Sequence, residues 1–197
     1  MNINRKPRVT FYAIAAIATV LLTGCGAAIQ SNTDAASPTP GGAEGPVAAD
    51  FQISVYQGGE SLGGQQVSFA DLLGQGKPVV LNLWAGLCPA CRLEMPDFEE
   101  VSSALGDDVI LFGLDVGPFT NLGTNEDGLA LLQTLGVTYP AGTTVDAGVV
   151  REYQLIGMPT TYFITPDGEI IEQWTGLLTR DKLTELVQVL IDASESS

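Results

Sequence analysis

Two cysteines separated by two residues, Cys88 and Cys91, have the spacing of a redox pair. They follow a compact apolar run at 79–84 and precede a stretch with helical periodicity, so they are expected where a strand passes into a helix. The unpaired N–H groups and positive dipole end of a helix N-terminus favour a thiolate, the attacking form of cysteine. We expect Cys88 to be the accessible nucleophile, and Cys91, one turn on, to resolve the mixed disulfide that Cys88 forms.

A zinc site, a structural disulfide and a pair of unrelated buried thiols each fit the two cysteines less well. A zinc site takes four ligands, whereas the 197-residue chain has three cysteines and no histidine. A purely structural disulfide stabilises mainly by closing a loop in the unfolded chain, and this loop is minimal. Two unrelated buried cysteines would not be expected at the start of a helix. We therefore predict a redox pair, with no metal site and no cofactor.

The elements that must position this pair are visible as short periodic segments. Apolar or alternating runs predict strands at 51–55, 79–84, 109–116, 160–164 and 169–174. Helical periodicity predicts one helix from the cysteines to about Leu105, two more at 126–135 and 146–153, and a last one with Thr179 as its N-cap. Residues 67–73 are predicted to form a short strand that leads into a helical turn.

The order of these elements predicts an α/β fold. The strands before and after the cysteine-bearing helix should pair in parallel through a right-handed crossover. The last two strands are joined by a Pro-Asp-Gly turn and should form an antiparallel hairpin. The sum is a βαβ unit followed by a ββα unit, with an N-terminal extension and a central helical insertion.

The cysteine-bearing helix is predicted to have one apolar and one polar face. The polar face should carry Glu94, Asp97 and Glu100. The apolar stripe should contain Leu93, Phe98, Val101 and Leu105.

The first 49 residues have the composition of a targeting signal followed by a flexible tether. Three basic residues precede an apolar run at 11–22, whose 12 residues are too few for a helix that crosses a bilayer. The run ends in Leu-Thr-Gly-Cys, which resembles the bacterial lipobox, so residues 1–24 are predicted to be a signal peptide and Cys25 the lipidated residue. The alternative is an uncleaved anchor with an incidental cysteine. Residues 25–49 are predicted to be a flexible tether and 50–197 the folded domain.

The charge of the chain is strongly one-sided. Its 23 acidic residues outnumber 8 basic ones, giving a net charge of −15, and three of the basic residues lie in the first ten positions. Such a chain repels phosphate backbones, so nucleic acid is not an expected partner. The charge is interpreted first as a contribution to solubility.

Two segments resemble a known family. Residues 79–96, VVLNLWAGLCPACRLEMP, resemble the active-site segment of the TlpA/ResA-type membrane-anchored thioredoxins. Residues 157–164, GMPTTYFI, resemble their second signature. The similarity extends from about Asp50 to Ile191 and implies a thioredoxin-like three-layer sandwich around a central mixed sheet.

The resemblance assigns roles to several positions. Pro159 should be a cis-proline facing the cysteines, and the backbone of Met158 should pair with an extended substrate segment. Three further positions, Trp84, Leu87 and Pro89, are expected to belong to the substrate-binding surface. Pro96 matches a kink in the active-site helix.

Glu94 has two competing interpretations. It matches an acidic residue that some members of the family keep near the cysteines, where it would handle protons. The alternative is an ordinary solvated charge on the helix face.

Three departures from the family bear on function. Leu87 stands where the family usually has Trp, and Asn82 stands where thioredoxin has a buried Asp that can act as a base. The dipeptide between the cysteines contains no His of the kind that stabilises the thiolate in strong oxidants of this fold. This last departure favours a reductant or a weak isomerase.

The predicted function is an extracytoplasmic thiol–disulfide oxidoreductase, held on a bacterial membrane by lipid and monomeric. The resemblance implies that its substrates are disulfides of exported proteins, including apocytochrome c. Its electrons would come from a membrane thiol-transfer protein, because no soluble reductant pool is expected outside the cell. The alternatives are a Cu(I)-binding chaperone, in which Met158 would assist the two thiolates, and a redox-inert interaction module on the same fold. Peroxidase activity is disfavoured because peroxiredoxin-like sites have a Thr or Ser three residues before the reactive cysteine, and here that residue is Ala85.

Overall fold

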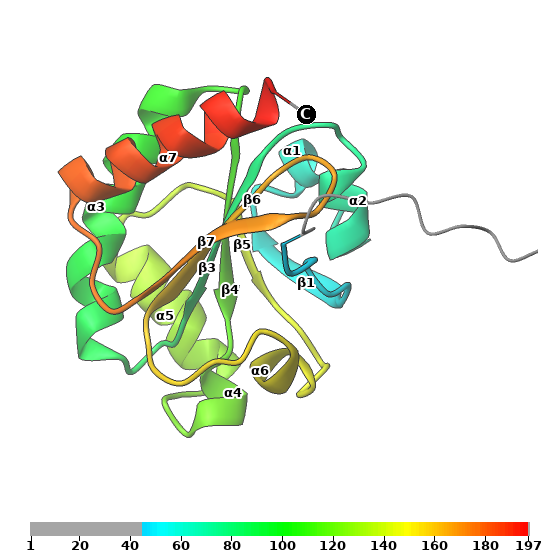
Figure 1. The fold of residues 1–197 in the computed structure, drawn as a ribbon. Helices are drawn as coiled ribbons and strands as arrows, with labels where there is room; N and C mark the ends of the chain where they lie inside the picture. Colours follow the sequence, from blue (N-terminus) through cyan, green and yellow to red (C-terminus); the bar gives the residue numbers. More distant parts are fainter. Residues whose placement is uncertain (1–44, 197) are drawn as a thin grey trace, which may run out of the picture. The chain divides into compact units, whose positions relative to one another are not determined.

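A seven-stranded mixed sheet lies at the centre of the computed structural model, which describes residues 45–196 (Figure 1). The spatial order of the strands is β2-β1-β5-β4-β3-β6-β7. In chain order the strands are β1 (Gln52–Gln57), β2 (Gln66–Ser68), β3 (Val79–Trp84), β4 (Ile110–Asp115), β5 (Ala141–Thr143), β6 (Thr160–Ile164) and β7 (Ile170–Thr175). The predicted signal peptide, the lipidation site Cys25 and most of the tether lie outside the described residues.

Helices cover both faces of this sheet. They are α1 (Gly59–Leu62), α2 (Phe69–Leu73), α3 (Pro89–Leu105), α4 (Gly117–Thr120), α5 (Asn125–Leu135), α6 (Val149–Glu152) and α7 (Arg180–Ser194). One apolar core joins the sheet to α3, α5 and α7, and a second joins it to α1, α2 and α6 (Figure 1). This arrangement confirms the predicted three-layer α/β sandwich. No helix within residues 45–196 is both long and apolar enough to cross a membrane.

Strand β3 lies inside the sheet, between β4 and β6, and leads directly to the cysteines. All six of its residues are buried, which explains why its sequence is a nearly continuous apolar run. It pairs in parallel with β4 and antiparallel with β6, and β6 continues into an antiparallel hairpin with β7. The predicted parallel pairing across α3 and the predicted hairpin are therefore confirmed.

Two elements of the insertion are not predicted individually by the sequence. Strand β5 has only three residues, one of them Gly142, which is too short for an alternating pattern to be visible. It nevertheless joins the two halves of the sheet, pairing antiparallel with β1 and parallel with β4. The segment after β4 reads as a loop in the sequence, yet it contains the short helix α4.

The predicted start of the domain at residue 50 is too late. Backbone hydrogen bonds attach the preceding residues to the β6–β7 turn: Ala48 N donates to Gly168 O at 2.8 Å, and Ile170 N donates to Pro46 O at 2.8 Å. The tether is predicted because the segment has no aromatic residue and too little apolar surface to form a core. Main-chain hydrogen bonds do not depend on apolar side chains, so residues 45–49 belong to the folded part.

The predicted faces of α3 require correction at two positions. Glu94 is fully buried, whereas Leu93 is 69% exposed. The buried residues of α3 are Cys91, Glu94, Met95, Phe98 and Val101. Glu94 falls on this stripe because it stands three positions after Cys91, so helical spacing rather than residue type decides its location.

Candidate active site

Cys88 lies at the N-terminus of α3, as its position after a strand predicts. It is the N-cap residue, and its Sγ accepts a hydrogen bond from Cys91 N at 3.2 Å, while Pro89 occupies the first turn. The two cysteines form a disulfide with their Cα atoms 5.3 Å apart. The pair therefore stands where helix geometry favours the thiolate of Cys88 once the disulfide is reduced.

The exposure of Cys88 is lower than expected. Cys88 is only 4% exposed and Cys91 is fully buried beneath it. Cys88 is reached through a cavity of about 340 Å³ that it lines together with Met158. The reactive cysteine is therefore part of the lining of a cavity and not a freely exposed side chain.

The residues from the second signature lie across the cavity from the cysteines. The Met158–Pro159 peptide bond is cis, as the resemblance implies. Gly157 and Met158 line the cavity, and Pro159 is buried. Because β6 pairs with β3, two segments about seventy residues apart meet at one end of the sheet.

The three further positions that are expected to contact substrate, Trp84, Leu87 and Pro89, divide into two groups. Leu87 is 59% exposed and Pro89 is also exposed, so both can contact a partner. Trp84 is fully buried in the core against α3 and α5. The prediction that Trp84 belongs to the substrate-binding surface is therefore wrong. The place of Trp84 follows from strand alternation, which turns its side chain inward with that of Val80.

Glu94 is buried one helical turn after Cys91. Its Oε1 accepts a hydrogen bond from Asn82 Nδ2 at 2.9 Å, and its Oε2 accepts one from Leu178 N at 3.0 Å. Burial raises the pKa of Glu94 from 4.5 to about 7, outweighing these two hydrogen bonds, which lower it. The solvated alternative is therefore wrong, and near pH 7 this carboxyl can either give or take a proton.

Asn82 holds the Glu94 carboxyl group in position through a hydrogen bond. Its Nδ2 also donates to Thr161 Oγ1 at 3.0 Å, so one amide joins α3 to β6. Three buried polar atoms in this core, Asn82 Oδ1, Trp84 Nε1 and Tyr139 OH, have no hydrogen-bond partner within the described residues. The amide cannot serve as a base, so it positions the carboxyl that can.

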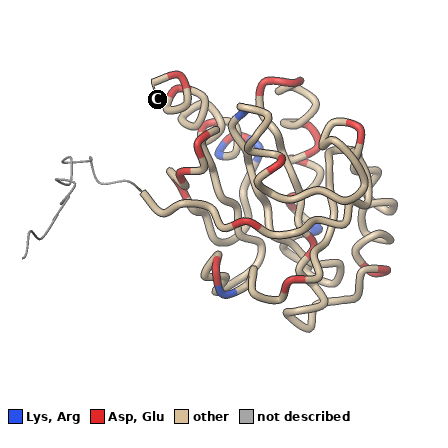
Figure 2. The backbone as a smooth tube through the Cα atoms, turned by 90° about the vertical axis from the view of Figure 1, so that its right-hand side faces the viewer, with Lys and Arg blue, Asp and Glu red and all other residues tan. Residues whose placement is uncertain are grey.

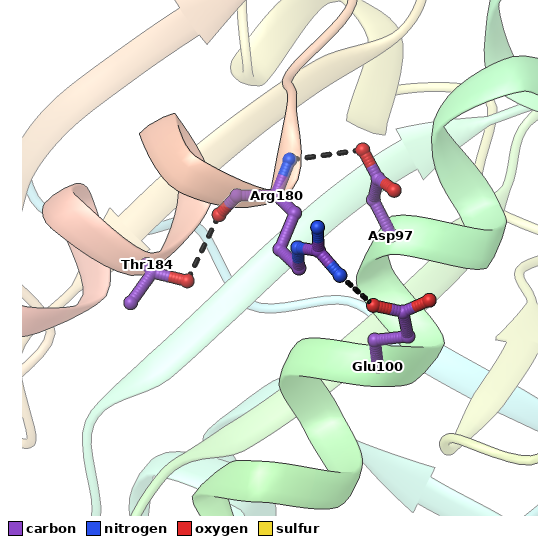
Figure 3. A network of polar contacts seen from close by, with 4 residues as sticks. All are labelled: Asp97, Glu100, Arg180 and Thr184. Carbon is purple, nitrogen blue, oxygen red and sulfur yellow. Dashed lines mark hydrogen bonds and ion pairs between the residues drawn. The ribbon is translucent and has the colours of Figure 1, made fainter.

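The start of α7 is fixed on α3 beside this site (Figure 3). Arg180 N donates to Asp97 Oδ2 at 2.9 Å, its guanidinium contacts Glu100, and Thr184 Oγ1 donates to Arg180 O. These contacts hold the segment before α7 in place. The N–H of Leu178 is thereby kept on Glu94.

A second buried carboxyl, Asp115, is not among the site residues predicted from the sequence. It ends β4 directly beside Trp84 at the end of β3. Its Oδ1 accepts from Gly117 N at 2.9 Å and its Oδ2 from Tyr56 OH at 3.1 Å. Burial raises the pKa of Asp115 to about 6. The sequence does contain a signal for Asp115, because it is an acidic residue at the end of a strand predicted to run parallel to β3. The carboxyl ends of parallel strands meet at one edge of the sheet, so Asp115 could have been expected near the cysteines.

Two glycines allow α5 to pack against this region. A Cβ on Gly128 would lie 2.1 Å from Asp115 Oδ2, and a Cβ on Gly86 would lie 2.5 Å from the carbonyl carbon of Asp127. Both distances are too short for any side chain. The start of α5 therefore rests directly on the loop between β3 and Cys88.

Comparisons with known proteins agree with this geometry. Residues 45–173 match the model of the AhpC/TSA family. The chain is 34% identical over 142 residues to the thiol-disulfide oxidoreductase ResA of Oceanobacillus iheyensis, covering 71% of this chain and 68% of the relative.

Solved structures share the fold. A crystal structure of a putative thiol:disulfide interchange protein DsbE from Chlorobium tepidum aligns with a TM-score of 0.62 at 20% identity, covering 75% of this chain and 97% of that one. An exposed lipoprotein thioredoxin (Etrx1) of Streptococcus pneumoniae aligns with a TM-score of 0.59 at 21% identity, covering 72% and 99%.

Proposed function

Because the chain belongs to the AhpC/TSA family and is a thiol–disulfide oxidoreductase of the ResA-like thioredoxin type, we propose that it reduces disulfides of exported proteins through Cys88 and Cys91. The observation that carries the proposal is the position of the cysteine pair at the N-terminus of α3. Cys88 lines the same cavity as residues 156–158, which lead to cis-Pro159 and are called the cis-proline loop below.

The reaction proceeds in two exchange steps. In the dithiol form, the Cys88 thiolate attacks one sulfur of the substrate disulfide; a Cys88–substrate bond forms, the substrate S–S bond breaks, and the other substrate sulfur leaves as a thiolate that takes up a proton. Cys91, after losing its proton, attacks Cys88 Sγ. This closes the Cys88–Cys91 disulfide and releases the second substrate thiol, so two electrons have passed to the substrate.

Glu94 is proposed to accept the proton of Cys91. Burial in apolar surroundings disfavours a thiolate, so Cys91 needs a base nearby. Glu94 lies one turn along the same helix, and a pKa of about 7 suits a group that must take a proton and later return it. The carboxylate is the active form in this step, which therefore quickens as the pH rises through about 7.

The direction and the setting of the reaction rest on the sequence. The dipeptide Pro89-Ala90 lacks the His of strong oxidants, which favours reduction. The signal-peptide pattern and Cys25 support attachment by lipid to the outer side of a bacterial membrane. We propose that the protein acts there as a monomer. Disulfide-containing exported proteins such as apocytochrome c would be the substrates, and a membrane thiol-transfer protein would return the electrons.

Single-cysteine variants test the reaction. In the full chain with Cys25→Ser, so that the third cysteine cannot react, Cys91→Ser should trap a mixed disulfide with a disulfide-bonded peptide. Cys88→Ser should trap none and should not reduce the peptide. Mass spectrometry of the trapped adduct reads out the result, and a Cys88→Ser protein that still reduced the peptide would overturn the proposal.

A further inference from the structure

The cavity that admits substrate to Cys88 has two apolar walls. One wall comes from the segment after β4 and the other from α6 and the cis-proline loop. The lining residues are Cys88, Pro89, Ala90, Thr120, Leu122, Val150, Leu155, Ile156, Gly157 and Met158. None of these residues is charged, although acidic residues occur at many other places along the described chain (Figure 2).

Large apolar side chains remain exposed at this opening. Ile156 is 87% exposed and Leu87, which immediately precedes Cys88, is 59% exposed. Exposed apolar groups gathered beside an uncharged cavity mark a contact with a partner. A phosphate or a basic peptide finds no charged partner among the lining residues, whereas an aliphatic or aromatic side chain finds several apolar ones.

The wall after β4 is fixed relative to Cys88. Leu87 N donates to Leu122 O at 2.8 Å, and Thr120 Oγ1 donates to Val116 O at 3.1 Å. The same segment is anchored where Gly117 N donates to Asp115 Oδ1. These bonds leave the cavity pre-formed, so it can discriminate between side chains without first being rebuilt.

We propose that this cavity is a subsite for an apolar side chain next to the disulfide-bonded cysteine of the substrate, with Leu122 and Ile156 as its specificity-determining residues. The inference rests on the proposed function and names its substrate class. The bond between Cys88 Sγ and the substrate sulfur forms at the cavity as the substrate S–S bond breaks. The residue adjacent to that sulfur is therefore carried to these walls in every turnover.

Matched peptides test the subsite. Two peptides that differ only in Leu or Asn beside the cysteine are each disulfide-bonded to the same small thiol. The reduced full chain with Cys25→Ser should react with the Leu peptide about tenfold faster or more, the discrimination typical of a hydrophobic pocket. Stopped-flow measurement of Trp fluorescence gives the second-order rate constants.

Variants locate the effect. Ile156→Asn, at a highly exposed position where little packing is lost, should reduce the Leu:Asn preference several-fold, and Leu122→Asn should reduce it further. Val189→Asn removes an apolar side chain that is 49% exposed on α7 and does not line the cavity, so it should leave the preference unchanged.

The outcomes separate the two proposals. Equal rates for the Leu and Asn peptides, or a preference that survives both cavity variants, would overturn the subsite while leaving the oxidoreductase function standing. Failure to reduce either peptide would overturn the proposed function, and the subsite with it.

Discussion

Glu94 and Asp115 are both fully buried carboxyl groups near the cysteines, yet their surroundings differ. Glu94 stands one turn after Cys91 and is held by the Asn82 amide and the Leu178 N–H. Asp115 ends β4 and is held by Tyr56 OH and the first N–H of α4. Within residues 45–196 neither forms an ion pair, so burial raises the pKa of both, to about 7 and about 6 respectively.

The comparison shows that location, rather than burial or pKa, separates a carboxyl suited to proton transfer from one suited to holding structure. Glu94 shares a helix face with the resolving cysteine. Asp115 instead fixes the segment that forms one wall of the substrate cavity. We expect substitutions at Glu94 to change the kinetics first, and substitutions around Asp115 to change mainly the stability and the wall.

The largest expected effect is that of Glu94→Gln on turnover. Loss of a general base typically costs about 10²–10⁴-fold, and we expect the rate of substrate-disulfide reduction above pH 7 to fall within that range. The rise in rate through about pH 7 should disappear as well. Stopped-flow pH profiles read out both effects.

Two controls give this experiment its meaning. Asp115→Asn should keep the inflection near pH 7, and Glu185→Gln, at an exposed position on α7, should behave as the unchanged protein. An unaltered pH profile in Glu94→Gln would mean that Glu94 is only structural.

The next effect concerns stability against pH. A carboxyl whose folded-state pKa is raised contributes stability that is fully present below its unfolded pKa and is lost as pH rises through the folded pKa. A rise from 4.5 to about 7 for Glu94 corresponds to about 3 kcal/mol of unfolding free energy lost across that window. A rise from 3.8 to about 6 for Asp115 has a similar size at lower pH.

Urea unfolding of the oxidised protein at a series of pH values separates the two groups. Glu94→Gln should flatten the decline in stability up to about pH 7, and Asp115→Asn should flatten only the part up to about pH 6. Identical windows for the two variants would contradict the distinction between them.

Part of this arrangement could be predicted from sequence because it is encoded locally. The apolar run of β3, the N-cap Thr179 and the spacing of Cys88 and Cys91 each lie within a few neighbouring residues. The sequence leaves the burial of Glu94 open, since its environment comes partly from Leu178, which is distant in sequence.

Other features depend entirely on contacts across the fold. Asp115 is buried and accepts hydrogen bonds from Tyr56, which is distant in sequence, and from Gly117, and no local pattern reports this burial. Trp84 belongs to the segment that resembles the family's active site, yet its burial depends on strand alternation and on packing against α5. The pairing of residues 45–49 with the β6–β7 turn similarly involves backbone atoms that composition does not describe.

A smaller effect is expected from Gly128→Ala. Its Cβ would lie 2.1 Å from Asp115 Oδ2, so the overpacked site should lose about 1–3 kcal/mol of unfolding free energy. Asp115→Ala frees that space, so the double variant should lose less than the sum of the two single losses. Strict additivity in urea unfolding would show that the two residues do not share this contact.

The smallest expected effect is that of Tyr56→Phe. Removing the hydroxyl that donates to Asp115 should cost about 1 kcal/mol and raise the pKa of Asp115 further, because that hydrogen bond lowers it. Tyr139→Phe is the matched control, since Tyr139 OH has no hydrogen-bond partner among the described residues. Carboxyl NMR titration and urea unfolding measure the two quantities, and equal costs for both variants would contradict the role given to Tyr56.

The most direct test of the account is the reduction potential of the Cys88/Cys91 pair, measured on the full chain with Cys25→Ser by equilibration against a thiol–disulfide buffer. A reductase without His between its cysteines should have a potential near or below that of thioredoxin, about −270 mV. A potential near about −120 mV, typical of a strong oxidant of this fold, would contradict the direction of electron flow proposed for this protein.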